Sequence, residues 1–217
     1  PASKPSVPVT PESAVTLTGE GLPFVSRGGL KLQRALELFP ITLAGLTCAD
    51  IGASTGGFTD CMLQHGAGKV YAIDVGTGQL HPSLLGVPRV VNMDQTNIRE
   101  VESLPEEPHF ISADVSFISL RLVLPVIARL LPDGGEAVVL VKPQFEAGKG
   151  AVGKNGVVKD PKTHLQVLRA VKGYALENGF APCGAGFSPI RGPEGNIEYL
   201  YWLRKGEGRG DVPDTAL

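Results

Sequence analysis

The sequence predicts an α/β fold built on a mostly parallel sheet that ends in an antiparallel hairpin. From residue 46 onward, short apolar segments that suit buried strands alternate with longer segments of helical periodicity, as in strand–helix–strand units. The last two apolar segments, residues 180–188 and 196–203, follow one another with only a turn between them. A final pair of this kind adds an antiparallel strand to a parallel sheet.

Residues 46–51 form the first predicted strand, because the segment is short, apolar up to its last acid and free of helical periodicity. A turn follows that contains three glycines, Gly52, Gly56 and Gly57. Glycine adopts positive φ easily and lets a ligand lie against the main chain. Phe58 starts a helix that ends near Gly66. The outward amide groups of such a turn favour a ligand that is anionic or rich in hydrogen-bond acceptors.

The spacing of this turn excludes two common nucleotide motifs. Residues 52–57 fit neither G-x-G-x-x-G nor G-x-x-x-x-G-K-[ST]. Asp50, before the first glycine, suits a ligand with an ammonium group. Asp74 and Asp94 close the next two predicted strands, where acids reach ribose hydroxyls and an adenine amino group. These features together describe S-adenosylmethionine, while another nucleotide in a Rossmann-like crevice stays open.

The other elements follow from the same patterns. Further strands are predicted at residues 70–74, 89–94, 109–114 and 136–141, and helices at residues 80–85, 119–131 and 162–178. An earlier helix carries Lys31 in its first turns and has Ser26 as its predicted N-cap. Pro125 should kink helix 119–131 or start a second helix. Ligands bind beyond the carboxyl ends of parallel strands, where Asp114 and Lys142 should join the acids named above.

Composition limits the class of protein. A chain of 217 residues with 42% hydrophobic residues forms one domain, with a short appendage at most. The apolar run at residues 118–131 is interrupted by charged residues and proline, so no membrane span is predicted. The three cysteines, Cys48, Cys61 and Cys183, should be buried thiols of a cytoplasmic protein. Neither they nor the four histidines have metal-ligand spacing, and no metal site is predicted.

The charged residues are unevenly distributed. The net charge is −2, yet residues 142–162 hold five lysines against two acids, a local charge of +3. This segment is a basic loop on a mildly acidic body, which suits contact with nucleic acid. An ordinary solvated loop is the alternative.

Five segments carry a family resemblance. In collinear order they are SRGGLKL at 26–32, DIGASTGGFTD at 50–60, DVSFISL at 114–120, VKPQFE at 141–146 and GNIEY at 195–199. They closely resemble the hemolysin-A-like (TlyA) ribosomal RNA methyltransferases, which have an FtsJ-type catalytic domain. The resemblance implies a seven-stranded Rossmann-like methyltransferase fold, S-adenosylmethionine as cofactor and a 2′-O-methylated ribose in ribosomal RNA as product. The family's catalytic tetrad matches four residues here: Lys31, Asp114, Lys142 and Glu198.

The residue patterns and the resemblance together assign the remaining parts of the chain. Residues 24–205 are the expected catalytic domain, residues 1–23 a linker left from an absent amino-terminal RNA-binding domain, and residues 206–217 a disordered tail. The expected cofactor-binding residues are Asp50, Gly52, Ser54, Gly56, Gly57, Phe58, Asp74 and Asp94. The expected RNA contacts are Arg27, Lys149 and Lys154. Ribosomal RNA or ribosomal subunits are the expected partners, with no membrane involved.

Methyl transfer to a ribose hydroxyl requires alignment and a proton acceptor. We expect neutral Lys142 to be that acceptor, because burial and the nearby cation Lys31 both disfavour its charge. Asp114 would orient the amine, and Glu198, in the last strand, would position Lys31 or the hydroxyl.

Two other functions stay open. A nicotinamide-dependent oxidoreductase would use a similar crevice but normally has G-x-G-x-x-G. A ribosome-assembly or RNA-binding factor, named as a hemolysin, could keep the cofactor pocket without turnover. Lytic activity itself has no support, since no amphipathic or spanning segment is long enough.

Overall fold

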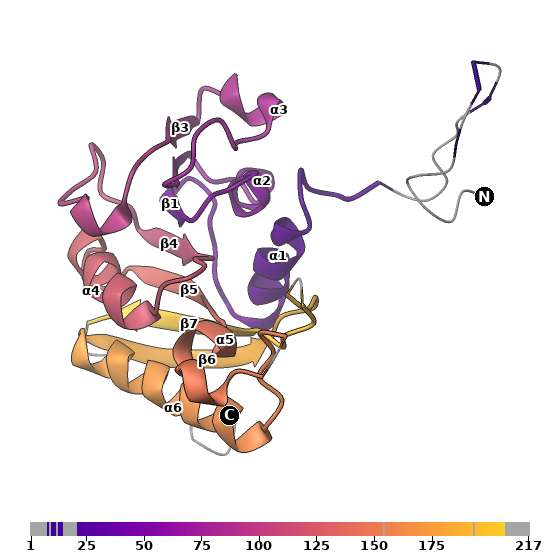
Figure 1. Cartoon of the computed structure of the whole chain (residues 1–217). Coiled ribbons are helices and arrows are strands. Elements are labelled where there is room, and N and C mark those ends of the chain that lie inside the picture. Colours follow the sequence, from indigo (N-terminus) through magenta and orange to yellow (C-terminus); the bar gives the residue numbers. More distant parts are fainter. Residues whose placement is uncertain are drawn as a thin grey trace.

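The computed structural model describes residues 8, 10–11, 13–14, 21–153, 155–192 and 194–206 (Figure 1). Most of the predicted linker and all but the first residue of the predicted tail lie outside these residues, as does Lys154. Domain boundaries and the disorder of the tail therefore stay predictions.

Within the described residues, seven strands form one sheet in the order β3-β2-β1-β4-β5-β7-β6. The strands are β1 (Thr47–Ile51), β2 (Lys69–Ile73), β3 (Val90–Met93), β4 (Phe110–Ala113), β5 (Glu136–Val141), β6 (Phe180–Phe187) and β7 (Tyr199–Lys205). Strands β1 to β5 are parallel to one another, and β7 is antiparallel to both β5 and β6. The mostly parallel sheet with an antiparallel hairpin at its end is thus confirmed.

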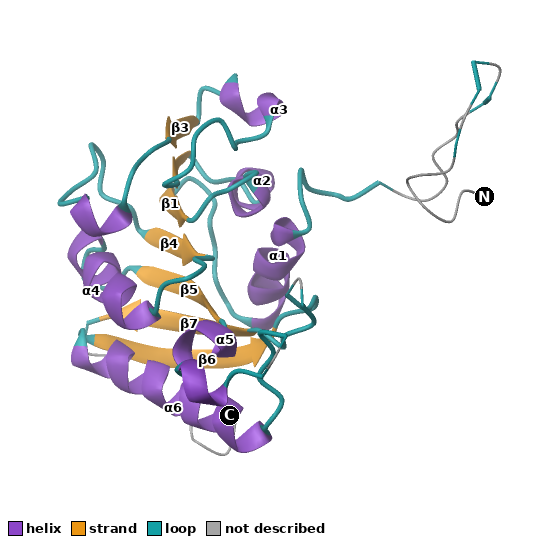
Figure 2. Cartoon of the chain, in the orientation of Figure 1, coloured by secondary structure: helices purple, strands orange, loops and turns teal. Residues whose placement is uncertain are grey.

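Helices cover both faces of the sheet (Figure 2). They are α1 (Gly28–Leu38), α2 (Gly57–Gln64), α3 (Pro82–Leu85), α4 (Leu120–Leu130), α5 (Pro143–Glu146) and α6 (Pro161–Glu177), with 3-10 turns η1 (Ile98–Glu100) and η2 (Lys149–Ala151). The side chains of β5 alternate between the faces. Val139 packs in the cluster that contains α4 and α6, whereas Val138 packs in the cluster that contains α1 and α2.

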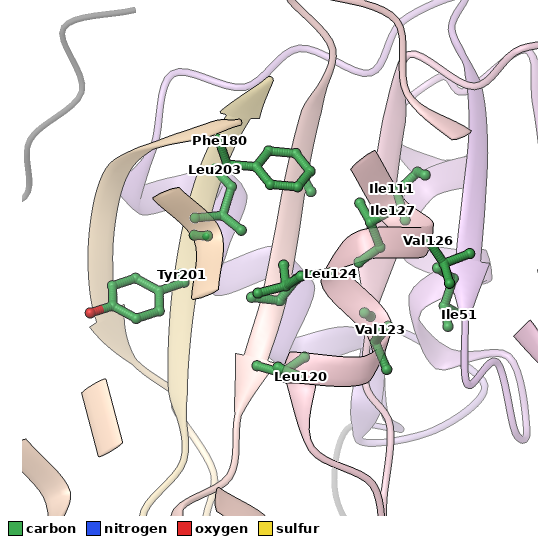
Figure 3. Packing of buried hydrophobic residues seen from close by; sticks show 14 of the residues in the cluster. Ile51, Ile111, Leu120, Val123, Leu124, Val126, Ile127, Phe180, Tyr201 and Leu203 are labelled. Atoms are coloured by element: carbon green, nitrogen blue, oxygen red, sulfur yellow. The ribbon is translucent and has the colours of Figure 1, made fainter. Parts of the chain in front are cut away.

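The core on the α4 side is built mainly from branched aliphatic residues, with a few aromatic residues and alanines. Figure 3 shows Leu124 and Ile127 of α4 among side chains such as Ile51 and Ile111 from the sheet. All four have at most 1% of their surface exposed. Burial of this kind contributes roughly 1.5–3 kcal/mol per large aliphatic side chain, so the carboxyl ends of β1 and β4, where the polar residues lie, rest on a rigid base.

Three local predictions are refined or corrected by the structure. The helix containing Lys31 begins at Gly28 with Arg27 as its N-cap, which makes no side-chain capping bond, so the prediction of Ser26 was wrong. Glu198 lies immediately before β7 and not within a strand. One helix, α4, runs through Pro125, its sixth residue, so no second helix begins there; the missing amide of proline removes one intrahelical hydrogen bond.

None of the helices in the described part of the chain has the length and apolar character that a membrane crossing requires.

Candidate active site

Strand order brings the four predicted tetrad residues to one edge of the sheet. Asp114 follows β4 and Lys142 follows β5, and these strands are parallel neighbours. In the antiparallel β5–β7 pair, Val141 lies opposite Tyr199, so Glu198 comes next to Lys142. Lys31 arrives from α1, on the face covered by α1 and α2.

The side chains of the tetrad form one cluster in which amines and carboxylates alternate. Nζ of Lys31 is 2.8 Å from Oε2 of Glu198 and 3.2 Å from Oδ2 of Asp114. The other oxygen of Asp114, Oδ1, is 2.5 Å from Nζ of Lys142. Lys142 also donates a hydrogen bond of 3.0 Å to Oγ of Ser116. Asp114 therefore bridges the two amines.

The cluster is largely shielded from water. Only 2% of the Glu198 side chain and 8% of the Lys142 side chain are exposed. Buried charges of this kind persist only when they are paired, which explains why two amines and two carboxylates occur together. Burial lowers the pKa of the Lys31 ammonium, but the charges of Asp114 and Glu198 outweigh it and raise that pKa above its ordinary value of 10.5. Lys31 thus keeps its proton at neutral pH.

A cavity of about 340 Å³ opens over the tetrad, and all four residues line it. Arg27 and Arg191 line the same cavity. Arg27 was predicted as an RNA contact, whereas Arg191 was missed. No sequence pattern marks Arg191, because it lies in the turn between β6 and β7 and only the packing of that turn brings it here.

A second cavity, of about 750 Å³, adjoins the first. Gly52, Ser54, Asp114 and Ser116 line both cavities, so a ligand in one can reach the other. The volume falls within the range of roughly 300–1,000 Å³ that is typical of small-molecule sites. Its remaining lining comes mainly from residues 73–75, 96–99 and 117–119, beyond the carboxyl ends of the strands, where sheets of this type bind nucleotides.

The glycine turn forms the wall between these cavities. Gly52 has φ +81°, and a Cβ built on it would lie 2.6 Å from the carbonyl oxygen of Asp114. Only glycine adopts this positive φ easily and also has no Cβ to collide with that oxygen. The amide of Ser54 donates to Oδ2 of Asp74 at 2.8 Å, and the amide of Gly76 donates to Oδ1 at 2.8 Å. Since each carboxylate oxygen accepts two hydrogen bonds, Asp74 can still bind ribose hydroxyls.

Asp50 and Asp94 are not among the residues that line the second cavity. The Asp50 carboxylate is buried and accepts hydrogen bonds from the hydroxyls of Thr59 (2.7 Å) and Ser112 (3.1 Å). Burial, opposed in part by these hydroxyls, raises the pKa of Asp50 to about 6. Asp94 accepts a hydrogen bond from the amide of Gly78. Their predicted contacts with the cofactor therefore lack geometric support. Asp50 instead holds two neighbouring side chains in place, and Asp94 holds the backbone of Gly78.

The three other predicted loop residues lie on different sides of the turn. Gly57 and Phe58 line the tetrad cavity. A Cβ on Gly56 would lie 2.4 Å from the Leu84 side chain, so Gly56 serves contact with α3. The roles of all predicted cofactor-binding residues stay predictions.

Phe117 was missed by sequence reasoning, although it lies in a segment that carries the resemblance. Its side chain is 90% exposed, its φ is +63°, and it lines the larger cavity. Its ring centroid lies 5.1 Å from that of Phe145, whose ring is 5.9 Å from Nζ of Lys142. A bulky residue in the left-handed region is strained, and such strain concentrates at functional sites.

The basic loop is described only in part. Lys149 begins η2, and Lys154 lies outside the described residues. Among the described side chains, no group of three or more His, Cys, Asp or Glu residues could hold a metal ion. Cys48 and Cys61 are buried free thiols, as predicted, and Cys183 is half-buried.

Comparison with known proteins identifies the family. The family described as FtsJ-like methyltransferase matches residues 24–205. The chain is 47% identical to the "16S/23S rRNA (cytidine-2′-O)-methyltransferase TlyA" of Mycobacterium tuberculosis, over 94% of this chain and 77% of the relative. It is 43% identical to "Hemolysin A" of Brachyspira hyodysenteriae, over 83% and 77%. A solved "Putative hemolysin" from Streptococcus thermophilus is 50% identical and superposes with a TM-score of 0.87, over 92% of this chain and 74% of that one. The chain belongs to the FtsJ-like methyltransferase family.

Proposed function

We propose that this protein is an S-adenosylmethionine-dependent methyltransferase that modifies the 2′-hydroxyl of a ribose in ribosomal RNA. The observation that carries the proposal is the Lys31–Asp114–Lys142–Glu198 cluster, which lines a cavity continuous with a nucleotide-sized one. The name of the M. tuberculosis relative specifies 2′-O-methylation of cytidine, so a cytidine is the first nucleoside to test.

The larger cavity suits S-adenosylmethionine. Asp74 would hold the ribose hydroxyls, the bare backbone around Gly52 would face the amino-acid part, and residues 96–98 would surround the adenine. When bound, the cofactor supplies an electrophilic methyl group on a sulfonium.

Lys142 accepts the proton of the attacking hydroxyl in this proposal. Lys31 holds a fixed positive charge, since its two carboxylate partners raise its pKa, so Lys31 itself is not the acceptor. Asp114 holds Nζ of Lys142 at 2.5 Å and so aims the amine. Glu198 anchors Lys31. Alignment and proton transfer of this kind each accelerate a reaction by several orders of magnitude.

RNA would reach the tetrad between basic side chains. Arg27 and Arg191 border the tetrad cavity, where a phosphate next to the reacting ribose would lie, and the basic loop with Lys149 and Lys154 adds charge. The exposed ring of Phe117 offers a surface for base stacking. Neutralising Lys149 and Lys154 together should weaken RNA binding and flatten its dependence on salt. An unchanged salt dependence would identify the loop as merely solvated.

The central experiment supplies ribosomal subunits with a labelled methyl donor and maps the labelled nucleotide. A 2′-O-methyl group is recognised because it protects the adjacent phosphodiester from alkali. Lys142→Ala should abolish transfer, while calorimetry shows unchanged cofactor affinity. Arg204→Gln, at the opposite end of β7, is the control and should remain active. Retained activity in Lys142→Ala would remove Lys142 from its role, and cofactor binding without any transfer by the unmodified protein would favour a binding factor.

A further inference from the structure

The turn between β6 and β7 encloses the Glu198 carboxylate. Within this turn, the amide of Gly195 donates to the carbonyl oxygen of Gly192 at 2.8 Å. The amide of Gly192 donates in turn to the carbonyl oxygen of Asn196 at 3.0 Å. The amide of Ser188 donates to the carbonyl oxygen of Glu198. Glu198 is therefore held in a folded turn and is 2% exposed, although it lies outside any strand.

Gly192 forms a wall against this carboxylate. A Cβ built on Gly192 would lie 2.8 Å from Oε1 of Glu198, and the other oxygen, Oε2, lies 2.8 Å from Nζ of Lys31. Gly192 is not among the glycines with positive φ, so a glycine is required here by the lack of room for a side chain and not by the backbone conformation. The atom that a Cβ would meet, Oε1 of Glu198, is the end of a side chain. An alanine would consequently displace the carboxylate and leave the chain path unchanged.

Asn196 and Tyr199 brace the chain on either side of Glu198. Asn196 is 3% exposed; its Oδ1 accepts from the amide of Val158 at 3.1 Å, and its Nδ2 donates to the carbonyl oxygen of Gly156 at 2.9 Å. The hydroxyl of Tyr199 bonds to Nδ1 of buried His164 at 2.8 Å, and Nε2 of that histidine bonds to the carbonyl oxygen of Val158 at 2.9 Å. Both braces end on residues 156–158, within the basic loop.

We propose that Gly192 and Asn196 are positioning residues that aim the Glu198 carboxylate at the ammonium of Lys31. Gly192 sets the depth of the carboxylate, and Asn196 fixes the backbone from which it projects. Both act through Glu198, and neither has to touch the reacting atoms. This inference rests on the proposed function for its kinetic consequences but not for its structural ones.

The test is a double-mutant cycle between Gly192→Ala and Glu198→Asp. Gly192→Ala should lower kcat by about 10²-fold, the loss expected for a misplacement of roughly 1 Å, with KM for cofactor and ribosomal subunits within about twofold. Aspartate is one methylene shorter and withdraws from the added methyl group. In the Glu198→Asp background, Gly192→Ala should therefore lower kcat by less than about threefold, a non-additivity typical of residues in contact.

Equal losses in both backgrounds, or a loss confined to KM for the subunits, would overturn the proposal. Gly173→Ala is the matched control, since Gly173 lies in α6 with open space at its Cβ, and it should keep full activity. Asn196→Ala, assayed well below its Tm, should reproduce the kcat loss, and an unchanged kcat would exclude Asn196.

A readout that does not depend on turnover separates this inference from the proposed function. Glu198 raises the pKa of Lys31, so displacing its carboxylate in Gly192→Ala should make the Lys31 ammonium titrate at lower pH by NMR. The same shift should appear even if the unmodified protein transfers no methyl group. An unchanged titration of Lys31 would refute the positioning role whatever the activity.

Discussion

Replacing Asp114 by asparagine tests the electrostatic design of the tetrad. Asp114 bridges two amines, at 3.2 Å from Nζ of Lys31 and 2.5 Å from Nζ of Lys142. Asparagine keeps the shape but removes the charge, which leaves the Lys31 ammonium with the single carboxylate of Glu198. Lys31 must then remain charged without its second partner or release its proton.

The magnitude follows from the burial of these groups. Removing one partner of a fully buried ion pair costs roughly 3–5 kcal/mol, and the 18% exposure of the Asp114 side chain reduces this to about 2–4 kcal/mol of unfolding free energy. Neutralising a lysine with an ordinary pKa of 10.5 at pH 7 costs about 5 kcal/mol, which sets the upper limit. Methyl transfer should fall by about 10²–10⁴-fold, since the proton acceptor loses its orientation.

Urea unfolding at several pH values checks the reasoning. In the unmodified protein the pKa of Lys31 is raised, so its contribution to stability is present below pH 10.5 and is lost above it. In Asp114→Asn the Lys31 pKa should fall below that of the parent, so the destabilisation should be largest near pH 7 and should shrink as pH rises through the Lys31 pKa of the variant. A destabilisation that does not vary with pH would show that Asp114 acts by packing or hydrogen bonding alone.

Three further outcomes follow from the geometry. Phe117→Ala should leave stability and cofactor affinity nearly unchanged, because the ring is 90% exposed. It should lower kcat/KM for ribosomal subunits by about 10-fold or more, as measured in initial-rate assays, since base stacking contributes roughly 1–3 kcal/mol. Gly52→Ala should abolish cofactor binding in calorimetry and lower Tm, because its Cβ would lie 2.6 Å from a backbone oxygen at φ +81°; normal binding would contradict the account of the turn. Asp50 has its pKa raised from 3.8 to about 6, so the folded state keeps that proton to higher pH and loses about 3 kcal/mol of stability between pH 4 and neutrality. Asp50→Asn lacks this loss, and its unfolding free energy relative to the parent should rise by that amount over the same range in urea titrations.

Much of the fold was accessible from local pattern. Residues 136–141 were predicted as a strand and form β5, because a short apolar run without helical period suits a strand buried on both faces. The N-cap of α1 was predicted wrongly, since Ser26 is a good capping residue but Arg27 is the N-cap of the helix that begins at Gly28. The Ser26 hydroxyl packs against Gly57, a tertiary contact that overrides a local preference worth only about 1 kcal/mol.

The sequence predicted which four charged residues come together, but not which of them contact one another. The positive charge of Lys31 near the start of a helix opposes the helix dipole. The carboxylates of Asp114 and Glu198 stabilise it, and they lie 83 and 167 residues away in the chain. Asp50 has the sequence position of a cofactor ligand, yet its side chain turns toward Thr59 and Ser112. The direction of a side chain at a strand end depends on which face is covered, and that is not a local property.

The sequence by itself determined most of the strands and helices and the glycine turn, because hydrophobic period and backbone freedom are encoded over a few neighbouring residues. The resemblance of five motifs indicated the family. Only the tertiary structure decided that Asp114 bridges two amines, that Arg191 borders the cavity and that Gly192 presses on Glu198. These arrangements follow from strand order and from the pairing of β7 with β5. They set distances between residues far apart in the chain, and the free energy of a charged contact depends on those distances and on burial.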